Sequence, residues 1–147
     1  MRLSEAMRLG ATLSPQTWGR LIGGYRPSEA GTEYSTCALG AAADAAGMLE
    51  LPKIASLHRV WPILNALVAE HELPVGISRR PFSRRLSQVI FYLNDVERWS
   101  RSRIADWIED YERRHPECVA TEESRPEPAA ANNDWESNEE GPLVACK

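Results

Sequence analysis

The amino-acid sequence predicts an all-α fold, a single small domain of five or six short helices followed by a disordered acidic tail. The clearest indication lies between residues 82 and 111. There, apolar side chains recur twice at the spacing that places them on one face of a helix. Two such faces joined by a short connection are expected to pack on each other or on a shared core.

The distribution of charge separates this helical domain from the tail. Residues 1–115 hold 15 Lys and Arg against 13 Asp and Glu, whereas residues 116–147 hold 2 against 8. The acidic segment has few aliphatic side chains, so it cannot bury enough apolar surface to offset the entropy of ordering it. We therefore predict a helical domain over residues 1–115 and a disordered tail over residues 116–147.

The chain opens with a predicted helix. Ser4 is a candidate N-cap, and Glu5 in the first turn is favourable next to the positive end of the helix dipole. Gly10 is a candidate stop, although the apolar pattern extends to Leu13 before Pro15 ends it. Residues 14–36 are then interrupted by glycines and prolines. They predict a long loop with a short strand pair or helical turn around residues 18–25.

Residues 37–46 predict a helix rich in alanine, with Ser35 or Thr36 as its cap and Gly47 as its C-terminal stop. Gly40 and the alanines are small enough to permit the close approach of a neighbouring element. The next helical pattern covers residues 55–70, and Pro62 interrupts it.

Because of that proline, we predict two short helices that meet near Trp61, the second covering residues 63–70, and then a turn at 73–76. The last two helices carry the apolar stripes. The first stripe consists of Phe82, Leu86, Val89, Ile90 and Leu93, and the second of Ile104, Trp107, Ile108 and Tyr111. Ser83 caps the first of these helices and Ser100 or Ser102 the second, which His115 and Pro116 end.

The three cysteines, Cys37, Cys118 and Cys146, are odd in number and widely spaced, so they form no disulfide framework and favour a reducing compartment. Cys37 is expected to be a small buried apolar side chain. No apolar run has the length of a signal peptide or of a membrane span. We therefore expect a cytoplasmic protein without a membrane partner.

Several segments resemble a known group of proteins. They are Leu-Ser-Glu-Ala-Met-Arg-Leu-Gly-Ala at 3–11, Pro-Gln at 15–16, Cys-Ala-Leu-Gly-Ala-Ala at 37–42, and the Leu-Asn-Asp, Trp-Ser-Arg and Ile-Ala-Asp-Trp-Ile pieces between 93 and 108. This order of motifs resembles a group of short, uncharacterised bacterial and prophage-encoded proteins over roughly residues 1–112. The resemblance implies a small helical fold and a mobile-element origin, and it brings no catalytic residue. Some members carry a cysteine pair between the second and third motifs, which residues 72–77 here lack, so no metal role follows.

The best binding candidates are basic. Residues 79–103 carry seven arginines against Asp95 and Glu97, and these arginines are Arg79, Arg80, Arg84, Arg85, Arg98, Arg101 and Arg103. Guanidinium groups donate paired hydrogen bonds to phosphate or carboxylate. Arg80, Arg84 and Arg85 are expected on the solvent side of the helix that follows Ser83. The alternative is a solvated face that pairs with nearby carboxylates or with the acidic tail.

The same two helices also invite a helix-turn-helix interpretation. It is not favoured, because no second amphipathic helix follows. If residues 100–112 were the recognition helix, Asp106, Glu109 and Asp110 would lie unfavourably close to phosphates.

Metal binding and catalysis find little support in the sequence. His115 and Cys118 form one weak ligand pair, with His58, His71 and Cys37 elsewhere, whereas a zinc site needs four converging ligands. There is no Gly-rich phosphate loop and no nucleophile-elbow pattern. We expect no metal, no cofactor and no enzymatic activity, and we assign Asn94 and Asp95 to capping the connection between the last two helices.

Among the tryptophans, Trp61, Trp99 and Trp107 are expected in the core, whereas Trp18 is either core or an exposed anchor for a partner. The sequence thus favours a non-catalytic binding or regulatory protein of phage or prophage type. It would contact a host or mobile-element protein through Trp18 and the exposed arginines. The alternative is nucleic-acid binding through the Arg79–Arg103 stretch. The oligomeric state stays open.

Overall fold

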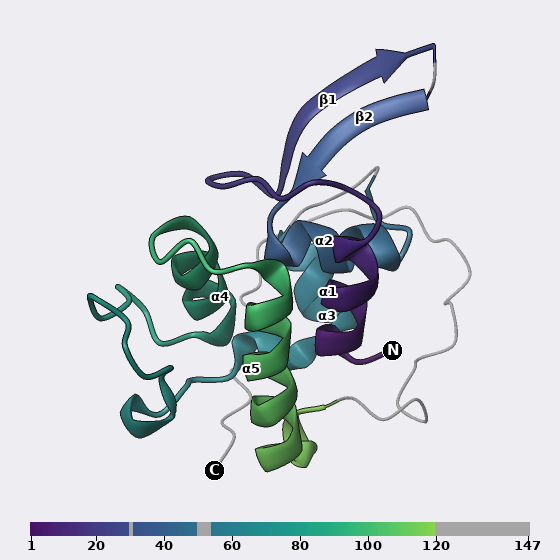
Figure 1. Cartoon of the computed structure of the whole chain (residues 1–147). Helices are drawn as coiled ribbons and strands as arrows, with labels where there is room; N and C mark the ends of the chain where they lie inside the picture. The colour runs from purple at the N-terminus through teal and green to yellow at the C-terminus, as the bar shows by residue number, and fades with distance from the viewer. Residues whose placement is uncertain (30, 50–53, 120–147) are drawn as a thin grey trace, which may run out of the picture.

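The computed structural model describes residues 1–29, 31–49 and 54–119. Five α-helices pack together, and a β-hairpin projects from them (Figure 1). The elements are α1 (Leu3–Ala11), β1 (Ile22–Ser28), β2 (Gly31–Thr36), α2 (Ala38–Ala45), α3 (Ile54–Val60), α4 (Leu86–Asp95) and α5 (Arg101–Arg114), with 3-10 turns η1 (Pro62–Asn65), η2 (Glu70–Glu72) and η3 (Pro116–Cys118).

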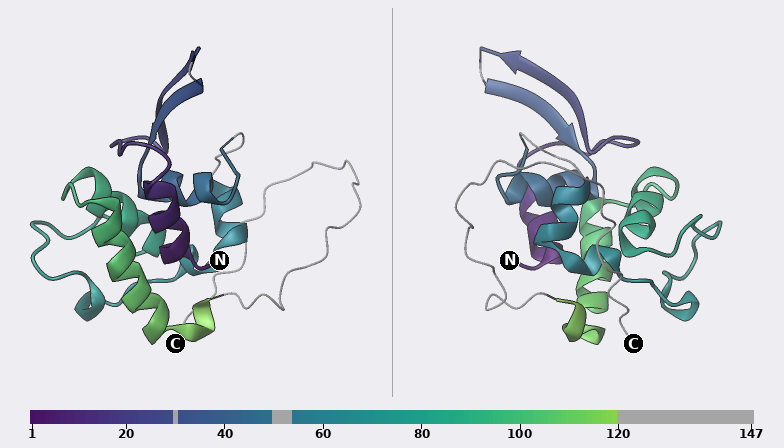
Figure 2. Two further views of the ribbon diagram at one scale, coloured as in Figure 1. Left: turned by 45° about the vertical axis from the view of Figure 1, so that its right-hand side comes forward. Right: turned by 180° about the vertical axis from the view of Figure 1, so that it is seen from behind.

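The helical body confirms the prediction of a helix-rich fold, but "all-α" is too narrow because of the hairpin. β1 and β2 are antiparallel, with Ile22 opposite Thr36 and Ser28 opposite Gly31. Both strands extend beyond the helices in each view (Figures 1 and 2). The expected loop over residues 14–36 is therefore wrong for its second half. The strand pair also lies later in the chain than the predicted 18–25.

One core joins the helices. All five of these helices contribute fully buried apolar side chains, among them Leu3, Ala6 and Met7 of α1, Leu39 and Ala42 of α2, Leu57 of α3, Val89, Ile90 and Leu93 of α4, and Ile104, Ile108 and Tyr111 of α5. Trp61 and Trp99 join this core, as predicted, while Trp107 is only partly buried against it. The stripe spacing of the last helix thus identified its buried face correctly.

The first helix differs from the prediction at both ends. Arg2 is the N-cap, and its N–H donates to Glu5 Oε2 at 2.9 Å. Ser4 is not the cap but lies buried inside the helix. Gly10 does not stop α1, because the helix continues through Ala11. Its lack of a side chain instead allows α1 to approach α2 closely.

The caps of α2 and α5 follow simple chemistry. Cys37 caps α2, and its Sγ accepts the Gly40 N–H at 3.4 Å, whereas Ser35 or Thr36 was expected. Gly47, with a φ of 69°, follows α2 as predicted. Ser100 Oγ accepts the Arg103 N–H at 3.2 Å and confirms one of the two caps proposed for α5.

The segment between α3 and α4 holds less helix than predicted. In place of a helix over residues 63–70, the chain forms the short turn η1 and then extends, because Ala66 has a ψ of 142°. The Val68 N–H donates to Arg84 O, and the Leu86 N–H donates to Ala66 O, both at 2.8 Å. This pairing holds residues 84–85 extended, so α4 begins only at Leu86 and Phe82 lies outside it.

The carboxyl-terminal end of the described chain also differs from the prediction. η3 continues the fold past residue 115, and Cys118 is buried. Cys37 is a buried free thiol, and burial raises its pKa. Cys118 is disulfide-bonded, so the inference of a reducing compartment from the absence of disulfides does not hold there. The predicted tail beyond residue 119, with Cys146, lies outside the described residues.

Candidate interaction surface

The N-terminal turn of α5 directs Arg101 into the protein, where only 7% of the residue is exposed. Its guanidinium donates to Thr36 Oγ1 at 2.7 Å, to the carbonyl oxygens of Ala11 at 3.2 Å and Pro15 at 3.4 Å, and to the carbonyl of Ser14. No carboxylate pairs with Arg101 within the described part of the chain. Burial lowers the pKa of Arg101, and carbonyl dipoles take the place of a counter-ion.

A second buried polar side chain, Asn94 at the end of α4, completes the arrangement. Its Oδ1 accepts from Gln16 Nε2 at 3.0 Å and from the Ala38 N–H at 3.3 Å. Its Nδ2 donates to Thr17 O at 3.0 Å. We call Gln16, Thr36, Asn94 and Arg101 the polar hub. The hub binds the loop after α1, the base of the hairpin and the start of α2 to the α4–α5 connection.

Three of the sequence motifs have a structural role in the polar hub. The Pro-Gln, Leu-Asn-Asp and Trp-Ser-Arg pieces meet there although up to 86 positions separate them. Arg101 is therefore a structural side chain and not the exposed binding residue that the sequence predicted. Asn94 and Asp95 were predicted to cap the connection between α4 and α5. That prediction is wrong, because both side chains hold the loop after α1 instead.

Next to the hub, two exposed arginines lie over two tryptophan rings, of which Trp18 is half-exposed and Trp99 is buried. Trp18 is 45% exposed and lies in the loop after α1. The neighbouring Gly19 N–H donates to Asp95 Oδ1 at 2.8 Å, and this bond holds the loop in place. The guanidinium carbon of Arg98 lies 5.0 Å from the centre of the Trp18 ring, and that of Arg103 lies 3.6 Å from the centre of the Trp99 ring. We call Trp18, Arg98, Trp99 and Arg103 the tryptophan–arginine face.

The backbone at Arg98 is unusual. Its φ of 56° makes it the one described non-glycine residue with a positive φ. A side chain in this region costs on the order of 1 kcal/mol, which a glycine would avoid. The conformation turns the chain between α4 and α5 and brings the arginine over Trp18. No carboxylate pairs with Arg98 or Arg103 in the described ranges.

The other predicted arginines precede α4 in the chain. Arg79, Arg80, Arg84 and Arg85 belong to residues 73–85, which we call the arginine loop, and none is in helix α4. The expected position of Arg80, Arg84 and Arg85 on that helix is therefore wrong. Arg80 pairs with Glu70 across the surface. The basic stretch of the sequence is thus divided into a loop before α4 and a face after it.

A carboxylate holds the arginine loop in place. Glu97 Oε1 accepts from Ser78 N–H at 2.8 Å, from Ser78 Oγ at 2.6 Å and from the Tyr92 hydroxyl at 2.9 Å. The hydroxyl bond from Ser78 is the main cause that lowers the pKa of Glu97. The loop nevertheless exposes two apolar side chains almost completely, Val75 at 96% and Phe82 at 108%.

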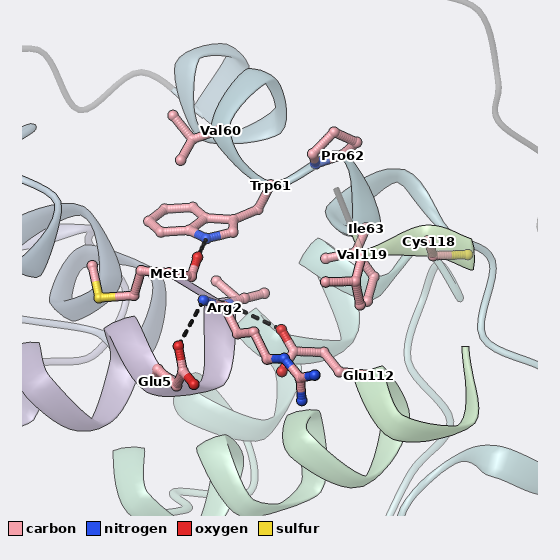
Figure 3. A pocket seen from close by; sticks show the side chains of 11 residues that line it. Met1, Arg2, Glu5, Val60, Trp61, Pro62, Ile63, Glu112, Cys118 and Val119 are labelled. Carbon is pink, nitrogen blue, oxygen red and sulfur yellow. Dashed lines mark hydrogen bonds between the residues drawn. The ribbon is translucent and has the colours of Figure 1, made fainter. Parts of the chain in front are cut away.

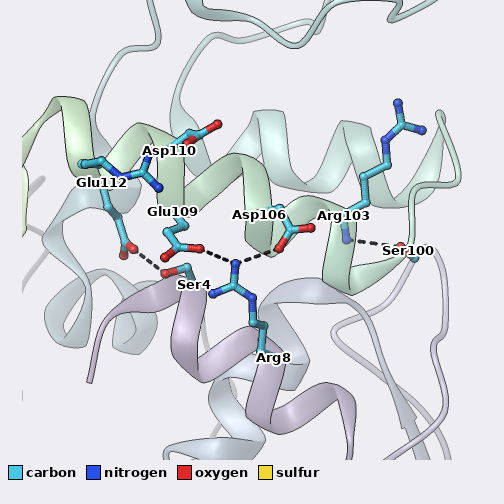
Figure 4. Close-up of polar contacts among 9 residues, drawn as sticks. Ser4, Arg8, Ser100, Arg103, Asp106, Glu109, Asp110 and Glu112 are labelled. Carbon is cyan, nitrogen blue, oxygen red and sulfur yellow. Dashed lines mark hydrogen bonds and ion pairs between the residues drawn. The ribbon is translucent and has the colours of Figure 1, made fainter.

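The surface of α5 that faces α1 is acidic. Arg8 Nη2 donates to Asp106 Oδ1 at 2.7 Å and to Glu109 Oε2 at 2.5 Å (Figure 4). These two hydrogen bonds raise the pKa of Arg8. Asp106 and Glu109 therefore pair with α1, and Asp110 pairs with Arg113 of the same helix.

A pocket with a volume of about 420 Å³ lies where the N-terminus meets η1 and η3 (Figure 3). Its buried acid is Glu112. Glu112 Oε1 accepts the Leu3 N–H at 2.9 Å, and Oε2 accepts the Ser4 hydroxyl at 2.5 Å. Both oxygens of the carboxylate therefore serve the start of α1.

The histidine of the weak ligand pair has another role. His115 Nε2 lies 2.7 Å from Glu72 Oε1, and Arg114 Nη1 lies 2.6 Å from the same oxygen. Over the residues that the structure describes, no group of three His, Cys, Asp or Glu side chains is placed to hold a metal ion. His58 lies in α3 apart from this group, and burial lowers its pKa.

The Glu72 cluster yields a prediction about acid stability. Burial opposes the charged carboxylate, but hydrogen bonds and positive charge from His115 and Arg114 outweigh it and lower the pKa of Glu72. A lowered pKa contributes stability above the usual carboxyl pKa of about 4.3, and the contribution is lost as pH falls through the folded value. Glu72→Gln should therefore be less stable than wild type at pH 6, with the gap closing towards pH 3.

Urea unfolding at pH 6, 4.5 and 3 measures this gap. Asp110→Asn, which removes only an exposed pair with Arg113, is the matched control and should show little change at any of these values. A gap for Glu72→Gln that stays constant across the range would contradict the linkage.

Comparison with protein-family models, with curated proteins and with solved structures finds no match to this chain. In the described ranges, every helix is too short or too polar to cross a membrane.

Proposed function

We propose that the protein is a non-catalytic binding protein that contacts a protein partner through the hairpin and the tryptophan–arginine face. The observation that carries this proposal is the position of Arg98, held in a costly backbone conformation over the half-exposed Trp18. Strained residues of this kind gather at functional sites.

The hairpin supplies a second element of the surface. Its sheet has two strands, so within the described residues each strand keeps one edge without a strand partner, apart from a single bridge from Gln16 to Thr36. An isolated two-stranded hairpin is marginal in water, and an open edge is a template for an added strand from a partner. The polar hub holds the base of the hairpin beside Trp18, because Thr17 N–H donates to Thr36 O at 2.9 Å.

The chemistry of the face favours an acidic protein surface. Tryptophan and arginine are the side chains most often found at the energetic centre of protein interfaces. Arg98 and Arg103 lack carboxylate partners within the described residues, and stacking on indole rings orders both guanidinium groups in advance. An ordered, unpaired arginine loses less entropy on binding a carboxylate.

The biological setting is part of the same proposal. A phage or prophage origin, and a host or mobile-element partner, are supported by the motif resemblance alone. A cytoplasmic location belongs to the same proposal, and no helix of the described residues is long and apolar enough to cross a membrane.

Two variants test the face. Arg98→Gly removes the guanidinium and suits the positive φ, so the fold should be at least as stable as wild type. Trp18→Ala removes the candidate anchor. Cross-linking and mass spectrometry of host lysate would identify the partner, and titration of the purified partner would measure affinity. We expect Trp18→Ala to weaken binding roughly 30-fold.

Arg59→Ala is the control, because Arg59 is exposed on α3, away from the face, and has no ion pair within the described part of the chain. It should leave the affinity unchanged. A purified partner that binds wild type, Arg98→Gly and Trp18→Ala equally well would disprove the assignment of this surface.

A further inference from the structure

The arginine loop has features that the proposed protein interface does not use. Between Glu72 and Asp95 the sequence contains four arginines and no carboxylate. Of these arginines, Arg79 and Arg84 are exposed and have no ion pair in the described ranges, whereas Arg80 pairs with Glu70. Phe82 lies between these two arginines in the sequence, and its exposure of 108% means that it packs on nothing.

The loop that exposes Phe82 is anchored to the rest of the protein. The preceding Pro81 is buried, and Pro74 at the start of the loop is buried as well. Glu97 fixes Ser78 through two hydrogen bonds, and Leu67 and Arg85 form an antiparallel bridge at the far end. An anchored segment therefore exposes an aromatic ring to water, close in sequence to two exposed arginines.

We propose that the arginine loop binds single-stranded nucleic acid, with Phe82 stacking on a base and with Arg79 and Arg84 contacting the flanking phosphates. Sequence-tolerant binding of single strands combines these two components, a positive surface that follows the backbone and an aromatic ring that accepts any base. All the loop's cations are arginines, whose planar donors match phosphate oxygens in pairs. A duplex would not offer its stacked bases to Phe82, so single strands are preferred.

Fluorescence anisotropy with a labelled 20-nucleotide oligo-dT, titrated with the full chain at 50 and 200 mM salt, tests this proposal. Binding should weaken steeply with salt, and a 20-base-pair duplex should bind more weakly. Phe82→Ala should lower the affinity about tenfold, and Phe82→Trp should retain it. Arg79→Ala with Arg84→Ala should reduce the slope of log affinity against log salt by about 1.4, or about 0.7 for each lost phosphate contact.

Two matched controls make the test specific. Val75→Ala removes an apolar side chain from the same loop that is as exposed as Phe82 but has no ring, and it should leave the affinity unchanged. Arg59→Ala with Arg113→Ala removes the same charge from exposed positions elsewhere and should leave the salt slope near the wild-type value. All these side chains are exposed, so thermal unfolding should show intact folds.

Three results would overturn the proposal. One is no anisotropy change at 50 mM salt. Another is oligonucleotide binding that the Phe82→Ala and double-arginine variants leave intact. The third is binding of phosphatidylserine vesicles, lost in Phe82→Ala, without oligonucleotide binding, which would assign the loop to anionic lipid. None of these results bears on Trp18 or Arg98, so the proposed protein interface is tested separately.

Discussion

Replacement of Arg101 by methionine should lower the free energy of unfolding by about 3 kcal/mol, although the new side chain fits a buried site. The guanidinium donates to four backbone carbonyls and to the Thr36 hydroxyl. An apolar replacement leaves these buried acceptors unpaired, and each unpaired group costs about 1–3 kcal/mol. Urea unfolding followed by circular dichroism measures the change.

A lysine at the same position separates charge from geometry. Arg101→Lys keeps the positive charge, but a single ammonium group cannot reach all the carbonyls that the two Nη atoms of the guanidinium contact. The Arg101→Lys protein should therefore also be less stable than wild type. The control is Arg113→Met, at the exposed end of the same helix, with an expected change within about 0.5 kcal/mol. An Arg101→Met protein as stable as wild type would show that the polar hub does not hold the fold together.

Gly10→Ala should destabilise the protein by about 2–3 kcal/mol, against the preference of helices for alanine. A Cβ atom at Gly10 would lie 1.7 Å from the carbonyl oxygen of Ala41, so helices α1 and α2 would have to separate. In an exposed helix the same change stabilises by roughly 0.5–1 kcal/mol. The sign of the effect therefore reports on the contact between the two helices.

Thermal and urea unfolding of Gly10→Ala measure this sign, with Leu9→Ala as the control. Leu9 is the adjacent residue in α1 and is 49% exposed, so its truncation should cost less than the glycine substitution. A Gly10→Ala protein that is more stable than wild type would mean that α1 and α2 do not approach each other this closely.

The helices were predictable where local chemistry decides them. Ser100 and the stripe of Ile104 and Ile108 set the start and the buried face of α5 without help from distant residues. The small residues of α2 predicted a close neighbour, and Gly40 has one, since a Cβ there would lie 2.0 Å from Leu21 O. In both cases the signal lies within one helix.

The prediction failed where distant backbone pairing overrides a local pattern. Phe82 is spaced correctly from Leu86 for a helix, but pairing with residues 66–68 holds residues 84–85 extended, and no local signal announces that pairing. The hairpin had a weak signal, because Thr32, Tyr34 and Thr36 alternate as in a strand. The glycines around that run masked it.

The candidate surface was only partly predictable for the same reason. Trp18 and Arg103 were identified as candidates from residue type, and Arg98 was one of the counted arginines. Their meeting depends on a backbone turn at Arg98 and on a loop 80 positions earlier in the chain. For Arg101 the prediction of an exposed binding residue failed, because residue type alone cannot distinguish a guanidinium in solvent from one that donates to buried carbonyls.

Native-state hydrogen exchange tests most directly whether the polar hub fixes the hairpin and the Trp18 loop to the helices. The amides of Thr17, Thr36 and Cys37 donate to Thr36, Pro15 and Leu21 at 2.9, 2.9 and 3.1 Å. Measured by NMR, they should exchange only through global unfolding, with the same free energy as the amide of Ile108 in α5. Exchange of these three amides at the rate of an unfolded chain, while Ile108 stays protected, would contradict a fixed binding surface.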